Sequence, residues 1–183
     1  MKGKIVVISG PSGVGKGTIC TTLMELIDAK FSVSTTTRKP REGEIEGVHY
    51  FFVTEEEFMR KKDNGDFLET NLYKGNYYAT SKDAVFDMIN KGINVVLEID
   101  VNGAENIKKL FPDAFLIYIA PPSIEELRQR LIDRRTDPIE DINERMEITK
   151  EEMKKIGIYD AVIVNDDLKK AIEETKKLIL KKI

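Results

Sequence analysis

The segment from which the rest of this sequence can be interpreted is Ile5-Val6-Val7-Ile8-Ser9-Gly10-Pro11-Ser12-Gly13-Val14-Gly15-Lys16-Gly17-Thr18. Its first four residues are apolar and β-branched, which is typical of a strand buried on both faces of a parallel sheet. The glycines that follow let the backbone adopt positive φ angles, so that successive N–H groups can point into one concavity. A helical pattern begins near Thr18, and a helix start adds unpaired N–H groups and the positive end of its dipole. Such a loop is built to hold a polyphosphate.

The glycines and the lysine have the spacing G-x-x-x-x-G-K, which is that of a P-loop, and Lys16 is placed to reach the β- and γ-phosphates. Where the motif has Ser or Thr after the lysine, this chain has Gly17, and the hydroxyl comes one position later at Thr18. Either Thr18 or a bound water could take part in coordinating Mg²⁺. A Gly-rich turn that merely opens a helix is the alternative. The strand before the loop and the helix after it favour a nucleotide-binding site.

Composition limits the class of protein. The chain has 183 residues, enough for one well-buried core, and a net charge of −3, which gives no general basic field for nucleic acid. The single cysteine, Cys20, is expected to be a buried thiol in a reducing compartment. No apolar run reaches the roughly 18 residues of a membrane helix, and the N-terminus leads directly into a strand. We therefore expect a cytoplasmic protein with no membrane or nucleic-acid partner.

Strand and helix patterns alternate along the chain and predict an α/β fold with a central parallel sheet. Long buried strands are expected at 5–8, 94–100, 114–119 and 161–164, and shorter extended segments at 31–34, 48–53, 67–70 and 76–78. Helices are expected at 17–29, 55–64, 81–90, 103–110, 123–134 and 141–155 and at the C-terminus. Ligands of such sheets bind at the carboxyl ends of the strands. The P-loop, Asp100 and Asn165 all fall on that edge.

Two segments depart from the repeating pattern. Residues 34–80 are rich in short strands and loops, and within them 35–43 contains too much Pro, Gly and hydroxyl for a helix or a central strand. Residues 125–157 form highly charged helices with little apolar periodicity. An insertion for a second substrate and a mobile lid would have these properties, whereas two solvated excursions are the alternative. The core of a single domain would then comprise 1–33, 81–124 and 158–183.

A second anion site is indicated by Arg38 and Arg41, which are three residues apart in a loop stiffened by Pro40. Both guanidinium groups could bind one phosphate, although surface charge is the ordinary explanation of an isolated arginine pair. The hydroxyl-bearing residues 34–37 and the nearby Tyr50 favour a site for a nucleoside monophosphate.

The sequence resembles the guanylate kinase family, whose members transfer the γ-phosphoryl group of ATP to GMP. The matching stretches are GPSGVGKGT at 10–18, SVSTTTRKPREGE at 32–44, GNYYAT at 75–80, LEIDVNGA at 97–104, RLIDRRTD at 130–137 and VIVNDDL at 162–168. They span essentially the whole chain in the order of the family, and the block at 32–44 is far more specific than the P-loop. The resemblance implies a three-layer α/β/α P-loop core with a GMP-binding insertion at 34–80 and a helical lid at 125–157.

The resemblance also implies roles for individual residues. ATP would be held by residues 10–18 together with Asn165, and Mg²⁺ by Thr18, Glu98 and Asp100. The GMP site would contain Ser34, Arg38, Arg41, Tyr50, Glu69, Tyr78, Thr80 and Asp100. Charge on the transferring phosphoryl group would be stabilised by Arg134 and Arg145. The other catalytic residues that the resemblance implies are Lys16, Arg38, Arg41 and Asp100. An ion pair between Arg145 and Asp141, one helical turn apart, is the plain alternative for Arg145.

The chemistry of guanine agrees with this assignment. Guanine presents an acceptor at O6 and donors at N1 and N2, whereas adenine has the opposite polarity at the corresponding edge. A guanine pocket therefore needs a carboxylate, which Glu69 would supply, and a hydroxyl, which Ser34 or Thr80 would supply. Rejection of adenine would follow from leaving Glu69 unpaired in a closed site.

Two other functions stay open at this point. Guanylate-kinase-like modules of scaffold proteins bind other proteins without catalysis, but they typically lose the nucleotide loop, which is complete here. A kinase for another monophosphate is the second alternative, and the set Ser34, Glu69 and Thr80 argues against it. The sequence distinguishes neither a monomer from a homodimer nor GMP from dGMP.

Overall fold

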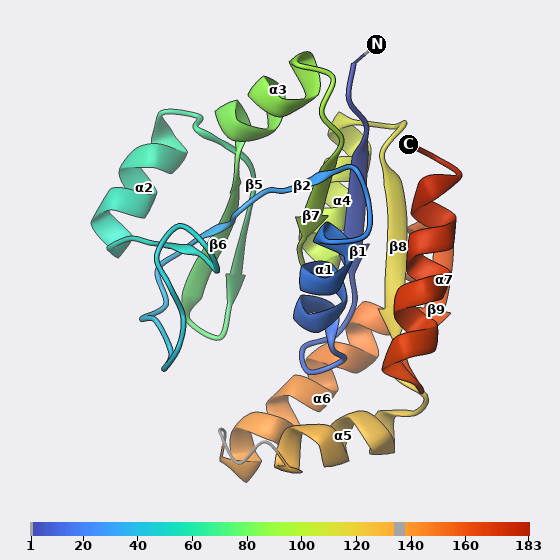
Figure 1. Ribbon diagram of the computed structural model, residues 1–183. Helices are drawn as coiled ribbons and strands as arrows, with labels where there is room; N and C mark the ends of the chain where they lie inside the picture. The colour runs from blue at the N-terminus through green and yellow to red at the C-terminus, as the bar shows by residue number, and fades with distance from the viewer. Residues whose placement is uncertain (1, 134–137) are drawn as a thin grey trace.

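Five parallel strands form the central sheet of the protein, which the computed structural model describes over residues 2–133 and 138–183 (Figure 1). Their spatial order is β2 (Lys30–Phe31), β7 (Val95–Glu98), β1 (Ile5–Ser9), β8 (Phe115–Ala120) and β9 (Ala161–Val164). The central strand, β1, pairs in parallel with β7 on one side and with β8 on the other. All five of its residues are buried, as the continuous apolar run predicts.

Helices cover both faces of this sheet. Val6 and Ile8 of β1 belong to an apolar cluster with α1 (Lys16–Met24) and α7 (Leu168–Leu180). Ile5 and Val7 belong to a second cluster with α3 (Lys82–Asn90) and α4 (Val101–Leu110). Alternate residues of one strand thus face opposite helical layers, and the predicted three-layer α/β/α core is confirmed.

A second, smaller sheet lies beside the core, with strands in the order β4 (Phe51–Phe52), β3 (Thr35–Thr36), β6 (Asn76–Ser81) and β5 (Phe67–Tyr73) (Figure 1). α2 (Glu55–Asp63) packs on it through the buried ring of Phe58, 4.9 Å from that of Phe67 and 5.2 Å from that of Tyr77. β5 and β6 are antiparallel and are joined at Lys74 and Gly75, which both have positive φ (49° and 73°). Two such residues in succession form the turn that matches the twist of a hairpin.

Two further helices, α5 (Ile124–Asp133) and α6 (Ile139–Met153), extend below the carboxyl ends of β1 and β8 in Figure 1. Their buried residues Leu127, Leu131, Ile142 and Met146 join the same apolar cluster as Val14 of the P-loop. A short 3₁₀ helix, η1 (Ile156–Ile158), then leads to β9. The charged helices expected at 125–157 are therefore anchored to the core by their few apolar residues.

The strand at Thr35–Thr36 corrects the prediction of a loop at 35–43. Thr35 pairs with Ala79 on one side and with Phe51 on the other, so this short strand is interior in its sheet. The partners are distant in sequence, and local composition cannot reveal such pairing. The β-branched threonines fit a strand once the partners are present.

Several predicted boundaries were wrong. The first helix ends at Met24 rather than near residue 29, because the chain tightens there: the N–H of Leu26 donates to the carbonyl of Leu23 at 2.9 Å. The strand expected at 94–100 ends at Glu98, and Asp100 is instead the N-cap of α4. Glu98 and Asp100 therefore do not share a strand face. The segments expected at 31–34, 48–53 and 141–155 are found at Lys30–Phe31, Phe51–Phe52 and Ile139–Met153.

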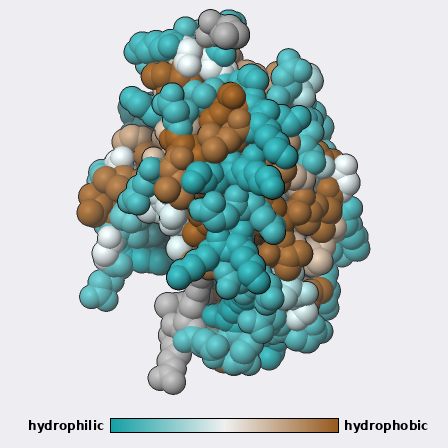
Figure 2. All heavy atoms as spheres, turned by 45° about the vertical axis from the view of Figure 1, so that its right-hand side comes forward, coloured by the Kyte–Doolittle hydropathy of each residue, from teal (hydrophilic) through white to brown (hydrophobic). Residues whose placement is uncertain are grey.

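Hydrophobic side chains that remain exposed are distributed over several elements, and on the face in Figure 2 they form separate patches among hydrophilic side chains. Among the helices of the described residues, 2–133 and 138–183, none combines the length and the apolar character needed to cross a membrane.

The core packing gives a stability prediction. Leu116, in the middle of β8, is fully buried, whereas Leu110, at the end of α4, is 55% exposed. Leu116→Ala should lower the free energy of unfolding by about 3 kcal/mol, because it leaves a cavity that the sheet cannot fill. The matched variant Leu110→Ala should cost less than about 1 kcal/mol. Urea unfolding of both variants tests this, and equal losses would contradict the assignment of the core.

Candidate active site

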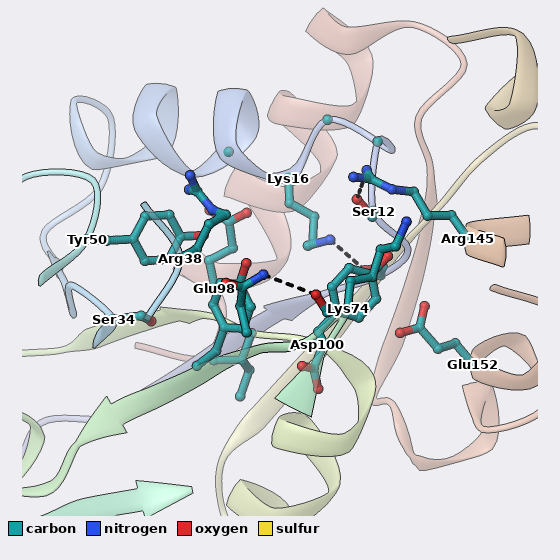
Figure 3. A pocket seen from close by; sticks show the side chains of 18 of the residues that line it. Ser12, Lys16, Ser34, Arg38, Tyr50, Lys74, Glu98, Asp100, Arg145 and Glu152 are labelled. Carbon is teal, nitrogen blue, oxygen red and sulfur yellow. Dashed lines mark hydrogen bonds between the residues drawn. The ribbon is translucent and has the colours of Figure 1, made fainter. Parts of the chain in front are cut away.

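One cavity of about 650 Å³ opens at the carboxyl ends of the core strands (Figure 3). Four parts of the molecule line it: the P-loop with the first turn of α1, the end of β7 with the residues that follow it, the second sheet with the loop between β3 and β4, and α6. From the P-loop and the first turn of α1 come Gly10, Ser12, Gly13, Gly15, Lys16, Gly17 and Thr18. The other sequence-predicted residues that line it are Ser34, Arg38, Arg41, Tyr50, Glu69, Tyr78, Glu98, Asp100 and Arg145. The structure thus brings most of the predicted site together.

The P-loop wraps around the ammonium group of Lys16. Its Nζ donates to the carbonyl oxygen of Gly10 at 2.5 Å and to that of Pro11 at 3.0 Å. Gly13 and Gly15 have φ angles of 93° and 99°, which favour glycine and turn the loop inward. Lys16 is therefore held at the mouth of the loop by weak carbonyl partners that an anionic ligand could replace.

Asn165, Val14 and Pro11 do not line the cavity. The buried side chain of Asn165 donates from Nδ2 to the carbonyl oxygen of Val14 at 2.8 Å, which ties the end of β9 to the P-loop. The side chain of Val14 is buried in the core, and Pro11 contributes its carbonyl to Lys16. These residues therefore support the conformation of the P-loop from the side that faces away from the cavity.

Arg38 is oriented before any ligand arrives. Its guanidinium group makes a two-point ion pair with Glu44, at 2.8 and 2.9 Å, and lies 5.4 Å from the centre of the Tyr50 ring. Partial burial would raise the pKa of Glu44, but hydrogen bonds from Arg38 and from the backbone of Arg41 outweigh it and lower the pKa. Glu44 stays ionised and fixes the arginine. Its role was missed, although it lies in the predicted loop block.

Glu69 is a buried carboxylate whose Oε1 accepts a hydrogen bond from the hydroxyl of Thr80 at 2.7 Å. Burial raises the pKa of Glu69 to about 7, against the Thr80 hydrogen bond and with a contribution from the charge of Asp100. A Cβ atom on Gly103, in the first turn of α4, would come within 2.9 Å of Glu69 Oε2. Thr80 does not line the cavity and reaches the site only through Glu69.

Asp100 is fixed by two hydrogen bonds. Its Oδ1 accepts from the backbone N–H of Gly103 at 2.9 Å, as the N-cap of α4, and its Oδ2 accepts from the side chain of Asn71. Asn71 belongs to β5, so this contact joins the second sheet to the core. Asn71 was not identified from the sequence.

Two more carboxylates, Glu98 and Glu152, lie close enough to Lys16 for its positive charge to oppose the rise that burial causes in their pKa values. Burial raises the pKa of Glu98, while Lys16 and a hydrogen bond with the thiol of Cys20 lower it. Burial raises the pKa of Glu152, on α6, to about 7, with Lys16 lowering it and Asp100 raising it. Within residues 2–133 and 138–183, however, no group of three or more acidic, His or Cys side chains could hold a metal ion. A cation here would need oxygen ligands from a substrate as well.

Arg145 projects from α6 toward the P-loop. It is 8% exposed, and its NH1 donates to the hydroxyl of Ser12 at 3.0 Å. Asp141, the alternative partner considered from the sequence, forms an ion pair with Lys74 at 3.1 Å. Arg134, the other predicted arginine of this region, lies outside the described residues.

Sequence reasoning missed several residues of the cavity wall, namely Tyr73, Lys74, Asn76, Ala79, Ile99, Asp141 and Glu152. One of them had a usable signal: Glu152 follows Arg145 by seven residues, which puts both on one face of a helix. Lys74 had none, because only the hairpin turn brings it to the cavity.

Comparisons with known proteins show the family of the chain. The guanylate kinase family model matches residues 2–182. The guanylate kinase of Shouchella clausii is 47% identical over 179 residues, which cover 97% of this chain and 87% of the relative. That of Caldanaerobacter subterraneus is 45% identical over 180 residues, with 98% and 87% coverage.

A solved structure extends the comparison to the fold. The crystal structure of guanylate kinase from Anaplasma phagocytophilum superposes with a TM-score of 0.84 at 33% identity, covering all of this chain and 87% of that one. The resemblance inferred from the P-loop and the arginine block is thereby confirmed over the full chain. This protein belongs to the guanylate kinase family.

Proposed function

We propose that this protein transfers the γ-phosphoryl group of ATP to GMP, and also to dGMP, with release of ADP and the nucleoside diphosphate. A phosphate oxygen of GMP attacks the γ-phosphorus, and the bond from that phosphorus to the β,γ-bridging oxygen breaks. The main support is that the P-loop lysine, the Arg38–Tyr50 pair and the buried Glu69 face one cavity. Membership of the family and the complete P-loop disfavour a non-catalytic binding module.

ATP would bind with its phosphates in the P-loop. The ammonium group of Lys16 would exchange the carbonyls of Gly10 and Pro11 for β- and γ-phosphate oxygens, which are stronger, charged partners. Thr18, Glu98 and Asp100 offer hard oxygen ligands of the kind that Mg²⁺ takes together with substrate phosphates. Mg²⁺ would supply neutralisation of the charge on the phosphoryl oxygens. Asn165 would support ATP binding by holding the loop at Val14.

GMP would bind against the second sheet. Arg38, Arg41, Tyr50 and Tyr78 would bind its phosphate. The carboxylate of Glu69 would accept from guanine N1–H and N2–H, and the Ser34 hydroxyl would serve O6, with Thr80 orienting Glu69. Adenine would leave the buried Glu69 unpaired, which costs far more than the loss of one contact in water.

Transfer itself would depend on positioning and charge, since the protein has little covalent chemistry to perform. Arg145 and Arg134 would stabilise the charge that spreads over the transferring group. We propose that residues 34–80 act as the GMP-binding segment and 125–157 as a lid that excludes water, around a core of 1–33, 81–124 and 158–183.

The setting that we propose is cytoplasmic purine nucleotide metabolism. The one cysteine is a buried thiol, which suits a reducing compartment, and the net charge of −3 does not favour nucleic acid. The protein would act as a monomer or a homodimer on small-molecule substrates alone.

The direct test is release of ADP from MgATP with GMP, dGMP, AMP, CMP or UMP as the acceptor. We expect turnover with GMP and dGMP and little with the other three. Turnover with another base would keep the P-loop assignment and reject the guanine pocket. If ATP and GMP bind but no acceptor is phosphorylated, the protein is a binding module.

Lys16→Met should abolish phosphoryl transfer without unfolding the protein. The charge lost is the one that we place on the transferring phosphates, so kcat should fall by roughly 1,000-fold. The thermal unfolding temperature should stay near that of the wild type, because within residues 2–133 and 138–183 the hydrogen bonds of the Lys16 ammonium go to carbonyls of its own loop. Lys169→Met, at an exposed position of α7, is the matched control and should keep full activity. A variant that retains turnover would remove Lys16 from the mechanism.

Glu69→Gln should reduce the dependence of GMP binding on pH. In the free protein burial raises the pKa of Glu69 to about 7, whereas guanine N–H donors require the ionised form. GMP binding near pH 6.5 should therefore release protons, and GMP affinity should rise with pH and level off above about pH 7. Titration calorimetry in two buffers of different ionisation enthalpy measures the release. Glu69→Gln should lower the release to the part that comes from the GMP phosphate, whose second pKa is about 6, and weaken GMP binding by roughly 10- to 100-fold.

Glu152→Gln is the control for that experiment, because burial also raises the pKa of Glu152 to about 7. Its carboxylate lies across the cavity from Ser34 and Tyr50 (Figure 3), so the proton release on GMP binding should persist. Loss of the release in the Glu152 variant, and not in the Glu69 variant, would move the coupling away from the guanine pocket.

A further inference from the structure

Lys74 lies at the tip of the β5–β6 hairpin and reaches across the cavity to α6. Its Nζ is 3.1 Å from Asp141 Oδ1 and 3.3 Å from Glu144 Oε2. The Lys74 side chain is only 15% exposed, unlike the lysines of ordinary surface pairs such as Lys91, which is 63% exposed. Lys74 also adopts a φ angle of 49°, a conformation that disfavours most side chains other than Asn, Asp and Gly. An ion pair with a largely buried lysine and two half-exposed carboxylates therefore joins the second sheet to α6.

The helix segment that Lys74 holds is the one that carries Arg145. Asp141 lies one turn before Arg145, and Glu144 directly precedes it. Arg145 is buried and donates to the Ser12 hydroxyl of the P-loop at 3.0 Å. Lys74 and Arg145 both line the cavity (Figure 3). A shift of this turn of α6 would displace the guanidinium group of Arg145.

The residue before Lys74 contacts the same point of the P-loop. Burial raises the pKa of the Tyr73 hydroxyl, while the charge of Arg145 and a hydrogen bond with Ser12 lower it. Tyr73 and Arg145 thus meet at Ser12, one from the hairpin and one from α6. The hairpin turn, the first turns of α6 and the P-loop form a three-way contact.

We propose that Lys74 is a positioning residue. By holding Asp141 and Glu144, it fixes the position of Arg145 over the P-loop relative to the second sheet. This inference rests on the function proposed above. Because Lys74 belongs to the sheet that would bind GMP, and Arg145 faces the loop that would bind ATP, the ion pair links acceptor binding to the stabilisation of transferring charge. Its effect should appear in kcat, after both substrates have bound, rather than in either KM.

The test is a set of variants assayed with saturating MgATP and GMP. Lys74→Met keeps the aliphatic stem and removes the charge; it should lower kcat by roughly fivefold, with both KM values within about twofold of the wild type. Lys74→Arg should restore kcat to within about twofold, since the positive charge is retained. Lys91→Met, which removes the lysine of an exposed ion pair far from the cavity, should match the wild type.

A double-mutant cycle asks whether Lys74 acts through Arg145. Adding Lys74→Met to Arg145→Met should lower kcat no further, because the residue to be positioned is already gone. The double variant Asp141→Asn, Glu144→Gln should reproduce the Lys74→Met effect in an otherwise wild-type chain. That second route keeps the test intact if Lys74→Met lowers the unfolding temperature.

Three outcomes would overturn the inference. The first is an unchanged kcat in Lys74→Met, and the second is a raised KM for GMP at constant kcat, which would make Lys74 a direct phosphate ligand. The third is a full additional loss on top of Arg145→Met. Each differs from failure of the proposed function, in which the wild-type protein itself transfers no phosphoryl group to GMP.

Discussion

The close passage of Gly10 against the backbone of β8 is the constraint on which the site depends. A Cβ atom at position 10 would lie 2.2 Å from the carbonyl oxygen of Ile119, so only glycine allows the chain to leave β1 at this angle. The turn then brings the carbonyls of Gly10 and Pro11 to the ammonium group of Lys16. Asn165 fixes the far side of the same loop through Val14. The buried strand β1 gives this turn a rigid base. β8 contacts the turn at Gly10, and the residue after β9, Asn165, bonds to it at Val14.

The electrostatics of the site follow from burial more than from net charge. Glu69 and Glu152 both have a pKa of about 7, so neither is fully ionised near neutral pH without a ligand. A buried carboxylate without a donor is costly, and it becomes favourable when a ligand supplies N–H groups or a cation. Arg38 is the opposite case, because Glu44 already neutralises it and holds it in place. A mildly acidic chain can therefore bind two anionic nucleotides: its cations are oriented in advance, and its acids are partly protonated.

The sequence predicted the parts that depend on local pattern and failed where distant segments meet. The apolar run 5–8 and the glycine spacing after it gave the central strand, the P-loop and the α/β class, because both signals are local. The strand at Thr35–Thr36 was missed, because it exists only through pairing with β4 and β6. Asn71 and Lys74 were missed for a related reason: each acts through a partner that the fold brings to it. Glu44 was missed although its partner, Arg38, lies only six residues away in the same loop. The residues that we propose for a guanine pocket were assigned by resemblance, since a lone glutamate such as Glu69 carries no pattern of its own.

The contact between the two sheets explains why such partners matter. The second sheet has its own apolar packing, with the Phe58 ring between those of Phe67 and Tyr77. Two of its contacts with neighbouring parts of the molecule are instead polar: Asn71 with Asp100, and Lys74 with α6. Polar contacts change in strength when charged ligands enter beside them, whereas an apolar core does not respond in this way. The substrates would therefore bind beside the contacts that respond most to charge. A change in these contacts would alter the relative position of the two sheets, and Lys74 is one of the residues through which it would shift Arg145.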